Sequence, residues 1–582
     1  MRIMTRTIFA ILLLCALAPF GVVGQSTQPA ATTALDANAQ QLLLDVVVTD
    51  NGEHIHGLDR SRFHVFDDGR ELTLTSFEEH KPPAASSTPV ALPQLPPNFY
   101  SNLPQYAPSD TINVVLLDIL NTPVHNQQLL RHRLVEFLDN LPPGRTIAVF
   151  ALTSKLEQIQ GLTNNPSALK EAITALKNVD MRGKHGDSNA DKLGANDTRT
   201  INPVVTNALT DFWSNQYNYG VGNRFNMTFD AMKRLTKFLA LLPGRKNLIW
   251  LSGSFPVRVD ANIDSNPAAP SQSDTRDLDS LMCKARISFY PVDIYWQMTE
   301  ASFSANGNLD RSLDLSNKNM TVQASLIPPE TWIQSGTSID DLAEQTGGIA
   351  ARMPRDLAKP LDDAIEHGDS YYTLGFTPSD TGKKGVYHKL KVVLDGSYGK
   401  LAYWRAYYAK SGITTNVDRT NVAAIDRMNV AAIPGAPQLT DLHLLARVLP
   451  ADDPLFKGAK FPPGPAGDGI ANSKAPLTRY VIDLKVDSGK LTFSEPQPGV
   501  HHAELELLIV AYDAAGNRVN FFDHSAKLDY DDAKFKVIVD NGIHTSVPFD
   551  LPAGTVTLRI VAADKLSGKL GTLEVPLTVK AK

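Results

Sequence analysis

The strongest constraint on the fold is the apolar run from Ile112 to Leu117, which ends in Asp118. A run this apolar and this rich in β-branched residues is typical of a strand buried on both faces of a parallel sheet. In such sheets ligands bind just beyond the carboxyl ends of the strands. Asp118 and, four residues later, Thr122 would both lie at that edge. A carboxylate and a hydroxyl are oxygen ligands of the kind that Mg²⁺ or Ca²⁺ takes.

The segment around this run, 110–368, alternates apolar runs with amphipathic ones. The pattern predicts a doubly wound, mostly parallel sheet with helices on both faces. Two long polar stretches near 180–222 and 296–336 read as insertions, and either a functional role or disorder fits them. We expect strands over 112–120, 146–152, 156–162, 247–251 and 287–294, and helices over 127–141, 167–176, 224–242, 278–285 and 338–346.

The segments on either side have the two-residue period of half-buried strands. Residues 42–81 and 369–409 each contain about three such strands, too few to bury much surface alone. We therefore expect the two sets to pack into one β-sandwich, with the α/β domain inserted between them. Residues 82–109 are rich in proline and serine and predict an extended linker.

The last third of the chain is expected to be all-β. Residues 410–440 predict a linker, and 441–582 carry short, regularly spaced strands, including one expected over 533–539. That spacing is typical of an immunoglobulin-like or fibronectin-like sandwich.

The first 24 residues predict a secretory signal peptide, because Arg2 and Arg6 precede an apolar core and a small-residue end. Residues 25–41 predict a disordered linker. We therefore expect an exported protein, periplasmic or extracellular. Of the two cysteines, Cys15 lies in the signal peptide, which leaves Cys283 without an intramolecular disulfide partner.

Charge and hydropathy limit the kinds of partner and of membrane contact that the sequence predicts. The formal net charge is −6, which gives no reason to expect nucleic acid as a partner. Outside the signal peptide no stretch approaches the roughly 18 apolar residues of a membrane-spanning helix. We expect no transmembrane segment in the mature chain.

Five fragments in order resemble a known family. Together they span more than 300 residues: Val47–Gly52, Gly57–Gly69, Leu117–Thr122, Leu242–Gly253 and Tyr371–Pro378. The chain is similar to the von Willebrand factor A-related (vWA-related) secreted proteins of Acidobacteria. The resemblance implies an exported, non-catalytic protein with a vWA domain, whose first strand ends in Asp-x-Ser-x-Ser and holds a divalent cation.

The resemblance also implies a metal site in altered form. Asp118 and Thr122 match the first aspartate and the second serine, whereas Leu120 replaces the first serine. Thr163 fits the threonine of the second loop, and Ser252 stands where a later aspartate is expected. Mg²⁺ or Ca²⁺ held there would accept a carboxylate from a protein partner. The alternative is that Asp118 and Thr122 satisfy backbone N–H groups and cap the next helix.

The sequence is compatible with three functions to different degrees. The favoured hypothesis is a protein-interaction or adhesion module with no enzymatic activity. A structural scaffold without a metal is the alternative. An extracellular hydrolase is the least favoured, because the loop Ser252-Gly253-Ser254 lacks the Gly-x-Ser-x-Gly pattern of a nucleophile elbow. No residue is assigned a catalytic role.

Overall fold

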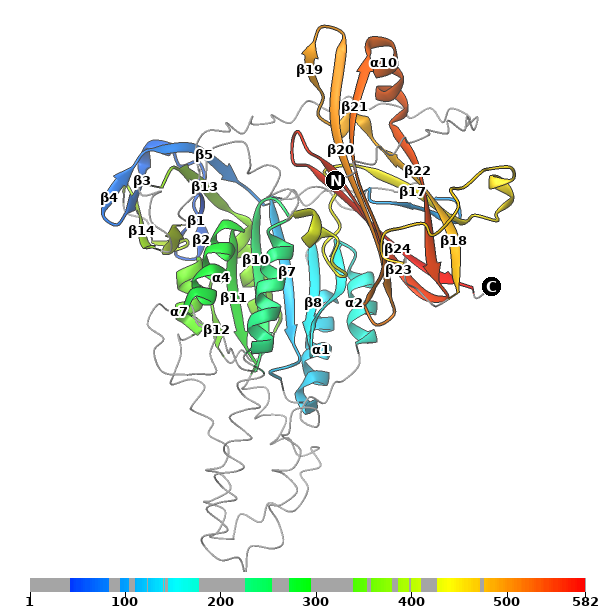
Figure 1. The fold of residues 1–582 in the computed structure, drawn as a ribbon. Helices are drawn as coiled ribbons and strands as arrows, with labels where there is room; N and C mark the ends of the chain where they lie inside the picture. Colours follow the sequence, from blue (N-terminus) through cyan, green and yellow to red (C-terminus); the bar gives the residue numbers. More distant parts are fainter. Residues whose placement is uncertain are drawn as a thin grey trace, which may run out of the picture. The chain divides into compact units, whose positions relative to one another are not determined.

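A computed structural model gives the fold of this chain, and all of the residues it describes belong to one compact unit, Gln40–Lys582. It describes residues 42–82, 95–103, 110–122, 124–139, 141, 145–176, 224, 226–253, 272–294, 339–352, 357–378, 386–396, 399–409, 427–470 and 476–580. The predicted signal peptide, the predicted linker 25–41 and the two predicted insertions lie outside these residues. The chain is rich in sheets, with five among the described residues (Figure 1).

The central sheet has six strands in the order β12-β11-β10-β7-β8-β9. All neighbouring strands in it run parallel except β9, which pairs antiparallel with β8 at one edge. The strands are β7 (Thr111–Asp118), β8 (Ile147–Leu152), β9 (Leu156–Thr163), β10 (Arg245–Ser252), β11 (Ile287–Asp293) and β12 (Ala351–Arg352). Every residue of β7, β8 and β10 is buried, as the apolar runs in the sequence predict.

Helices flank these strands (Figure 1). Val115 and Leu117 of β7 belong to one hydrophobic cluster, with residues of α1 (Val124–Asp139), α2 (Pro166–Ala175) and α8 (Ala358–Asp369). Val114 and Leu116 belong to another, with residues of a helix over 226–239, of α4 (Gln272–Lys284) and of α7 (Ile339–Thr346). Alternate residues of one strand thus serve two cores on opposite faces.

Two further sheets each combine strands from before and after the α/β segment. The first has the order β15-β1-β13-β5, with β2 beside β1, and the second has the order β16-β14-β3-β4. Their strands are β1 (Leu42–Asp50), β2 (Glu53–His54), β3 (Phe63–Asp67), β4 (Arg70–Leu72), β5 (Leu74–His80), β13 (Tyr371–Phe376), β14 (Val386–Leu394), β15 (Lys400–Ala402) and β16 (Ala406–Ala409). β1 and β5 pair with β13, and β3 pairs with β14. Inward residues of both sheets share one hydrophobic cluster.

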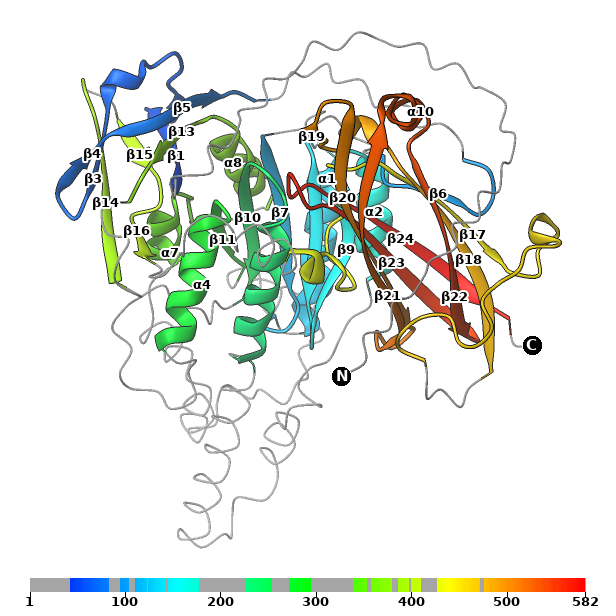
Figure 2. The ribbon, with the colours of Figure 1, turned by 45° about the horizontal axis from the view of Figure 1, so that its top comes forward.

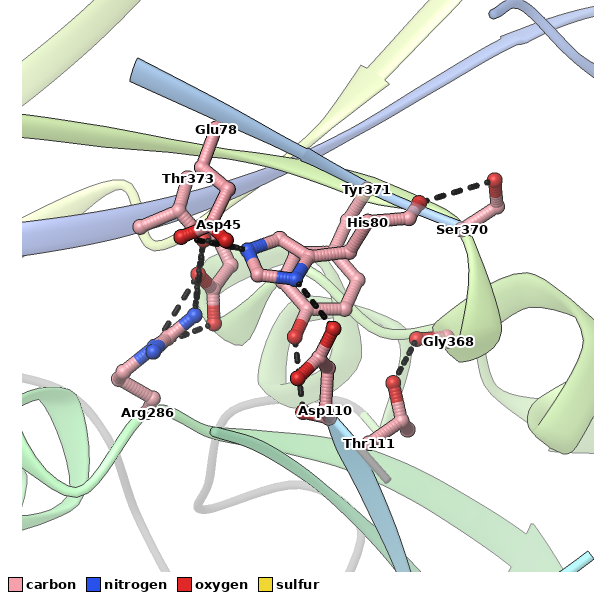
Figure 3. A network of polar contacts seen from close by, with 10 residues as sticks. All are labelled: Asp45, Glu78, His80, Asp110, Thr111, Arg286, Gly368, Ser370, Tyr371 and Thr373. Atoms are coloured by element: carbon pink, nitrogen blue, oxygen red, sulfur yellow. Dashed lines mark hydrogen bonds and ion pairs between the residues drawn. The ribbon is translucent and has the colours of Figure 1, made fainter. Parts of the chain in front are cut away.

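A buried polar network ties the first of these sheets to the amino-terminal ends of the central strands (Figure 3). Arg286, just before β11, forms an ion pair with Asp45 of β1, donating through both Nε and Nη2. Thr373 donates to Asp45 at 3.0 Å and lies 3.0 Å from His80 Nε2. The other ring nitrogen of His80 lies 3.0 Å from a carboxylate oxygen of Asp110, the residue before β7. The network joins residues on both sides of the α/β segment.

The C-terminal part consists of two sheets around a third hydrophobic cluster. One has the order β22-β18-β17-β6 and the other β19-β20-β23-β24, with β21 beside β20. The strands are β6 (Phe99–Ser101), β17 (Leu444–Pro450), β18 (Leu477–Val486), β19 (Ser494–Gln497), β20 (Val500–Asp513), β21 (Arg518–Asp531), β22 (Ile543–Pro552), β23 (Gly554–Asp564) and β24 (Leu570–Val579). β6 corrects the predicted linker 82–109, because Phe99–Ser101 pair with β17 as an edge strand.

The strand expected over 533–539 is wrong. These residues lie in α10 (Asp532–Asn541), beside β20 and β21 (Figure 2). Asp531 caps the helix by accepting from Lys534 N at 2.8 Å, and Gly542 ends it with a φ of 79°. Apolar side chains alternate every two residues in this segment, but the capping residues at both ends favour a helix, and none of its residues is buried.

The predicted linker 410–440 also needs correction in its described part. Residues 427–431 are helical, and Met428 and Ala431 are buried. The fully buried guanidinium of Arg559, on β23, donates to the carbonyls of Ala431, Ala436 and Pro437. This segment is therefore fixed to the C-terminal sandwich by hydrogen bonds and packing.

Candidate functional site

The carboxyl ends of β7, β8 and β10 meet at one edge of the central sheet. Asp118, the last residue of β7, is opposite Leu152 of β8, and Leu117 is opposite Leu251 of β10. The parallel pairing therefore brings Asp118 and Ser252 together, as the sequence predicts for residues that end neighbouring strands. Both are fully buried.

The carboxylate of Asp118 accepts hydrogen bonds from three side chains and one backbone group. Ser252 Oγ donates to Oδ2 at 2.7 Å, and Trp250 Nε1 donates to the same oxygen at 3.1 Å. The amide of Asn121 donates to Oδ2 at 2.9 Å and to Oδ1 at 3.1 Å, and its backbone N–H donates to Oδ1 at 3.0 Å. We call Asp118, Asn121, Trp250 and Ser252 the Asp118 site. Both oxygens of its carboxylate are supplied with donors from the protein itself.

Burial sets the charge of this group. Loss of solvent raises the pKa of Asp118 to about 6, and the donors from Asn121, Ser252 and Trp250 oppose that rise by favouring the ionised form. Asp118 is therefore ionised at neutral pH, where its charge is balanced by hydrogen bonds.

Of the two predicted positions after this strand end, Leu120 and Thr122, only Thr122 has a side-chain oxygen. Leu120 is buried in the hydrophobic core, and its backbone N–H donates to Leu152 O at 2.9 Å. Thr122 is buried, and its hydroxyl has no hydrogen-bond partner among the described residues. Its carbonyl accepts from Gln127 Nε2 at 3.1 Å, which fixes the turn into α1.

Thr163 is the site residue that the structure corrects. It lies opposite Ile147, the first residue of β8, whereas Asp118 lies opposite Leu152, the last. Five residues of strand separate those positions by roughly 16 Å. Because β9 runs antiparallel, its carboxyl end is at the opposite edge of the sheet. There the Thr163 hydroxyl accepts from Asn165 N at 3.1 Å, in the turn before α2.

The sequence reasoning missed Asn121, Trp250 and Thr228. Asn121 Nδ2 also donates to the hydroxyl of Thr228, on the helix over 226–239, at 2.9 Å. Trp250 could have been found, because it is two residues before Ser252 and shares its face of β10. Nothing local in the sequence links Asn121 to Thr228.

The residues at the Asp118 site therefore do not fit Mg²⁺ or Ca²⁺. Such ions take six or more oxygen ligands, several of them from carboxylates or water. Here one carboxylate is present, its oxygens already accept protein hydrogen bonds, and Leu120 and Thr163 supply no ligand. The sequence left open the alternative that the Asp118 carboxylate accepts from a backbone N–H at the strand end. The hydrogen bond from Asn121 N–H to this carboxylate is such a contact.

A different group of residues could hold a metal ion. Asp67, Asp68 and His388 place one ligand atom each within 4.8 Å of one another, in the β3–β14 ladder. We call these three residues the Asp67 cluster.

The outer face of the same ladder carries a shallow groove of about 790 Å³. Tyr387, Lys389 and Lys391 alternate along β14 and are exposed on this face. Neither lysine forms an ion pair with a residue that the structure describes. We call this groove the lysine groove; it is lined by Phe66, Asp68, Gly69, Tyr387, Lys389, Leu390, Lys391, Val393 and Arg405.

Cys283, the remaining cysteine, is not a reactive group. It is buried, and burial raises the pKa of its thiol to about 12. A thiol that stays protonated at neutral pH is a poor nucleophile.

Comparison with known proteins gives weak similarities only. No family model matches the sequence, and no curated protein matches it. A von Willebrand factor type A protein from Catenulispora acidiphila is similar in structure at 9% identity and a TM-score of 0.23, over 64% of this chain and 82% of that one. The fold is thus similar to a vWA protein at a low score.

Two other solved structures match shorter stretches. Conserved hypothetical protein BatB from Bacteroides thetaiotaomicron matches at 8% identity and a TM-score of 0.16, over 31% of this chain and 65% of that one. Proximal thread matrix protein 1 from the mussel byssus matches at 12% identity and a TM-score of 0.16, over 32% of this chain and 38% of that one. This chain thus spans less than two thirds of either protein. Among the described residues, no helix is both long and apolar enough to cross a membrane.

Proposed function

We propose that this chain is a non-enzymatic protein-interaction module with a doubly wound vWA-like domain, exported to the periplasm or the cell exterior. In this proposal the sheets of residues 42–81 and 369–409 form one sandwich, and residues 441–582 form an immunoglobulin-like domain. The parallel order of β12, β11, β10, β7 and β8, with hydrophobic clusters on both faces, supports the vWA assignment. The signal-peptide pattern of residues 1–24 supports export.

The interaction we propose does not use a metal at Asp118. A vWA domain that binds through a cation needs carboxylate oxygens free to coordinate it. In this chain Trp250, Ser252 and Asn121 donate to those oxygens, so the Asp118 carboxylate serves to fix the ends of β7 and β10.

The observation that carries an interaction role, rather than a scaffold role, is the lysine groove. Its two exposed lysines lie beside Phe66, Tyr387 and Val393 on a chain whose net charge is −6. Tyr387 is 43% exposed, although aromatic side chains gain from burial. Arg405 also lines the groove; its guanidinium is paired with Glu344 at 3.6 Å and stacks over Tyr403, with its carbon 4.3 Å from the ring centre. A cationic, partly aromatic groove fits an acidic protein segment that carries aromatic or aliphatic side chains.

The scaffold alternative makes a different prediction for the same face. A sheet face that is only solvated would show no saturable binding and no dependence on the positions of its lysines. The two hypotheses can therefore be separated by one titration.

The test is titration of the full chain with a synthetic peptide that alternates glutamate with tyrosine, at two salt concentrations. We expect saturable binding that weakens with salt, and at least tenfold weaker binding in the Lys389→Glu/Lys391→Glu variant. A Lys457→Glu/Lys536→Glu variant makes the same charge change at exposed positions outside the groove and should bind like the parent. Absence of saturable binding by the parent, or equal loss in both variants, would overturn the acidic-segment assignment.

A further inference from the structure

The Asp67 cluster lies where two strands far apart in the sequence meet. Asp67 ends β3 and is opposite Leu390 of β14, and Asp68 begins the turn to β4. His388 is on β14, and its side chain faces inward because Tyr387 and Lys389, its neighbours along the strand, face the solvent. The cluster therefore joins a residue after the α/β segment to two residues before it.

Polar atoms converge closely in this cluster. His388 Nδ1 lies 3.2 Å from Asp67 Oδ1 and 3.0 Å from Asp68 Oδ2. Even so, neither ring nitrogen of His388 makes a hydrogen bond of acceptable geometry with any described residue, although only 5% of the side chain is exposed. Buried polar atoms in proteins are nearly always hydrogen-bonded, so an imidazole with two such nitrogens needs an explanation.

The two distances from His388 Nδ1 are those of ligands around a shared cation. Ligand atoms about 2.1 Å from one ion, at angles between octahedral and tetrahedral values, lie roughly 3.0 to 3.4 Å apart. The contacts of His388 Nδ1 with both carboxylates fall in this range. A protonated imidazole between the carboxylates would also be attracted to them, but its N–H would have to point at one oxygen, and the ring is not oriented for that.

Tyr407 holds the cluster in this arrangement. Its hydroxyl donates to Asp67 Oδ2 at 2.9 Å, so Oδ1 is the oxygen nearest His388. Its ring stacks on that of His388, with centres 5.0 Å apart and planes 13° from parallel. Residues that orient metal ligands through hydrogen bonds and packing in this way are typical of metal sites.

The turn supplies the third ligand at the surface. Asp68 has a φ of 49°, and the backbone N–H of Lys389 donates to its Oδ1 at 2.9 Å, which turns Oδ2 toward His388. The Asp68 side chain is 51% exposed, so an ion can enter from the solvent on this side.

We propose that Asp67, Asp68 and His388 form a binding site for Zn²⁺. Zn²⁺ accepts both imidazole nitrogen and carboxylate oxygen as ligands, and three protein ligands leave one position for water. Mg²⁺ and Ca²⁺ prefer oxygen ligands alone and fit less well. Two carboxylates and one Zn²⁺ together are electrically neutral, which lowers the cost of burying Asp67 and His388. The ion ties β3 to β14 across the inserted α/β segment. This proposal does not depend on the proposed interaction function.

The test is calorimetric titration of the chelator-treated full chain with Zn²⁺, with thermal unfolding measured in parallel. We expect one Zn²⁺ per chain and a rise in melting temperature on binding. Co²⁺ in place of Zn²⁺ should give the visible absorption of a four-coordinate ion.

Two variants test whether Asp68 and His388 are the ligands of Zn²⁺. Asp68→Asn keeps the left-handed backbone conformation and the acceptor for Lys389 N–H, so it should fold normally and bind Zn²⁺ at least tenfold more weakly. His388→Gln should lose binding and the rise in melting temperature. If His388→Gln fails to fold, Asp68→Asn alone decides.

Two controls exclude other sites. Asp118→Asn should bind Zn²⁺ like the parent. His502 lies 2.6 Å from Asp529 and 3.4 Å from Glu504 on an exposed ladder, and His502→Gln should also leave binding unchanged. Lack of Zn²⁺ binding by the parent, or undiminished binding by Asp68→Asn and His388→Gln, would overturn the proposal.

Discussion

The Asp118 site and the Asp67 cluster both bury an aspartate at the end of a strand, and they treat its charge in opposite ways. Around Asp118 the neighbours are donors: an indole, a hydroxyl and an amide. Around Asp67 one donor is present, the Tyr407 hydroxyl on Oδ2 at 2.9 Å. The other oxygen, Oδ1, lies 3.2 Å from His388 Nδ1, which is also 3.0 Å from the Asp68 carboxylate and makes no hydrogen bond with described residues. A carboxylate surrounded by donors has no need of a cation, whereas converging acceptors do. Resemblance to a metal-binding motif therefore identifies a position, and the neighbouring donors decide its chemistry.

The largest effect is expected from Asp118→Ala, which tests whether the hydrogen bonds to the Asp118 carboxylate stabilise this edge of the sheet. The substitution leaves Trp250 Nε1, Ser252 Oγ and the Asn121 amide buried without their common acceptor. We expect a loss of about 4 kcal/mol in the free energy of unfolding, from urea denaturation. Asp118→Asn keeps the shape and one acceptor and should lose clearly less. Equal stability of parent and Asp118→Ala would show that these hydrogen bonds do not hold the edge together.

The second test uses pH. Burial raises the pKa of Asp118 from 3.8 to about 6, so the folded state binds a proton that the unfolded state has released between these values. Stability from this group is therefore complete below about pH 4 and is lost as pH rises through about 6, by roughly 3 kcal/mol. Other carboxyl groups titrate in the same range, so the quantity to measure is the difference in unfolding free energy between the parent and Asp118→Asn from pH 4 to 8. A difference that does not change with pH would contradict the raised pKa.

A third test asks whether the missing serine alone explains the lack of a cation site. Leu120→Ser supplies the hydroxyl of the Asp-x-Ser-x-Ser pattern that the sequence resembles, but it removes a side chain that is only 4% exposed from the core. We expect a loss of about 2.5 kcal/mol in unfolding free energy and no binding of Mg²⁺ or Ca²⁺ by calorimetry. Saturable Mg²⁺ binding by this variant would mean that the donors around Asp118 yield to a cation.

The mildest test concerns the Asp67 cluster. Tyr407→Phe keeps the ring that stacks on His388 and removes the hydroxyl that donates to Asp67. We expect a loss of about 1 kcal/mol in unfolding free energy from chemical denaturation and about tenfold weaker Zn²⁺ binding. Tyr403→Phe is a matched control, because its hydroxyl accepts from Arg405 and donates nothing to the cluster.

Much of the fold follows from local patterns in the sequence. The apolar runs at 112–117 and 247–251 predict the buried strands β7 and β10, because parallel strands covered on both faces have no exposed side chains. The alternation of apolar residues at 533–539 predicted a strand where the structure has a helix. The better signals there are Asp531, which caps the helix, and Gly542, which ends it. β6 was missed because three residues within a proline-rich segment give no periodic pattern.

The candidate site was less accessible to prediction than the strands that position it. Asp118 and Ser252 were found because the ends of parallel strands share an edge. Thr163 was misplaced because the direction of an edge strand depends on pairing, which the residues of β9 do not reveal. The Asp67 cluster was not predicted, since Asp68 and His388 are brought together by a strand pair that spans the whole α/β segment.

The pairing of β1 with β13 also affects when the sheet can form during synthesis of the chain. Val46 is opposite Tyr372, more than three hundred residues later in the chain. At a synthesis rate of about 5 to 20 residues per second, the partner of β1 emerges roughly 15 to 65 seconds after β1 itself. For that interval Leu44 and Val46 lack the strand that they pair beside in the folded protein, so this apolar strand edge stays open to pairing with other chains.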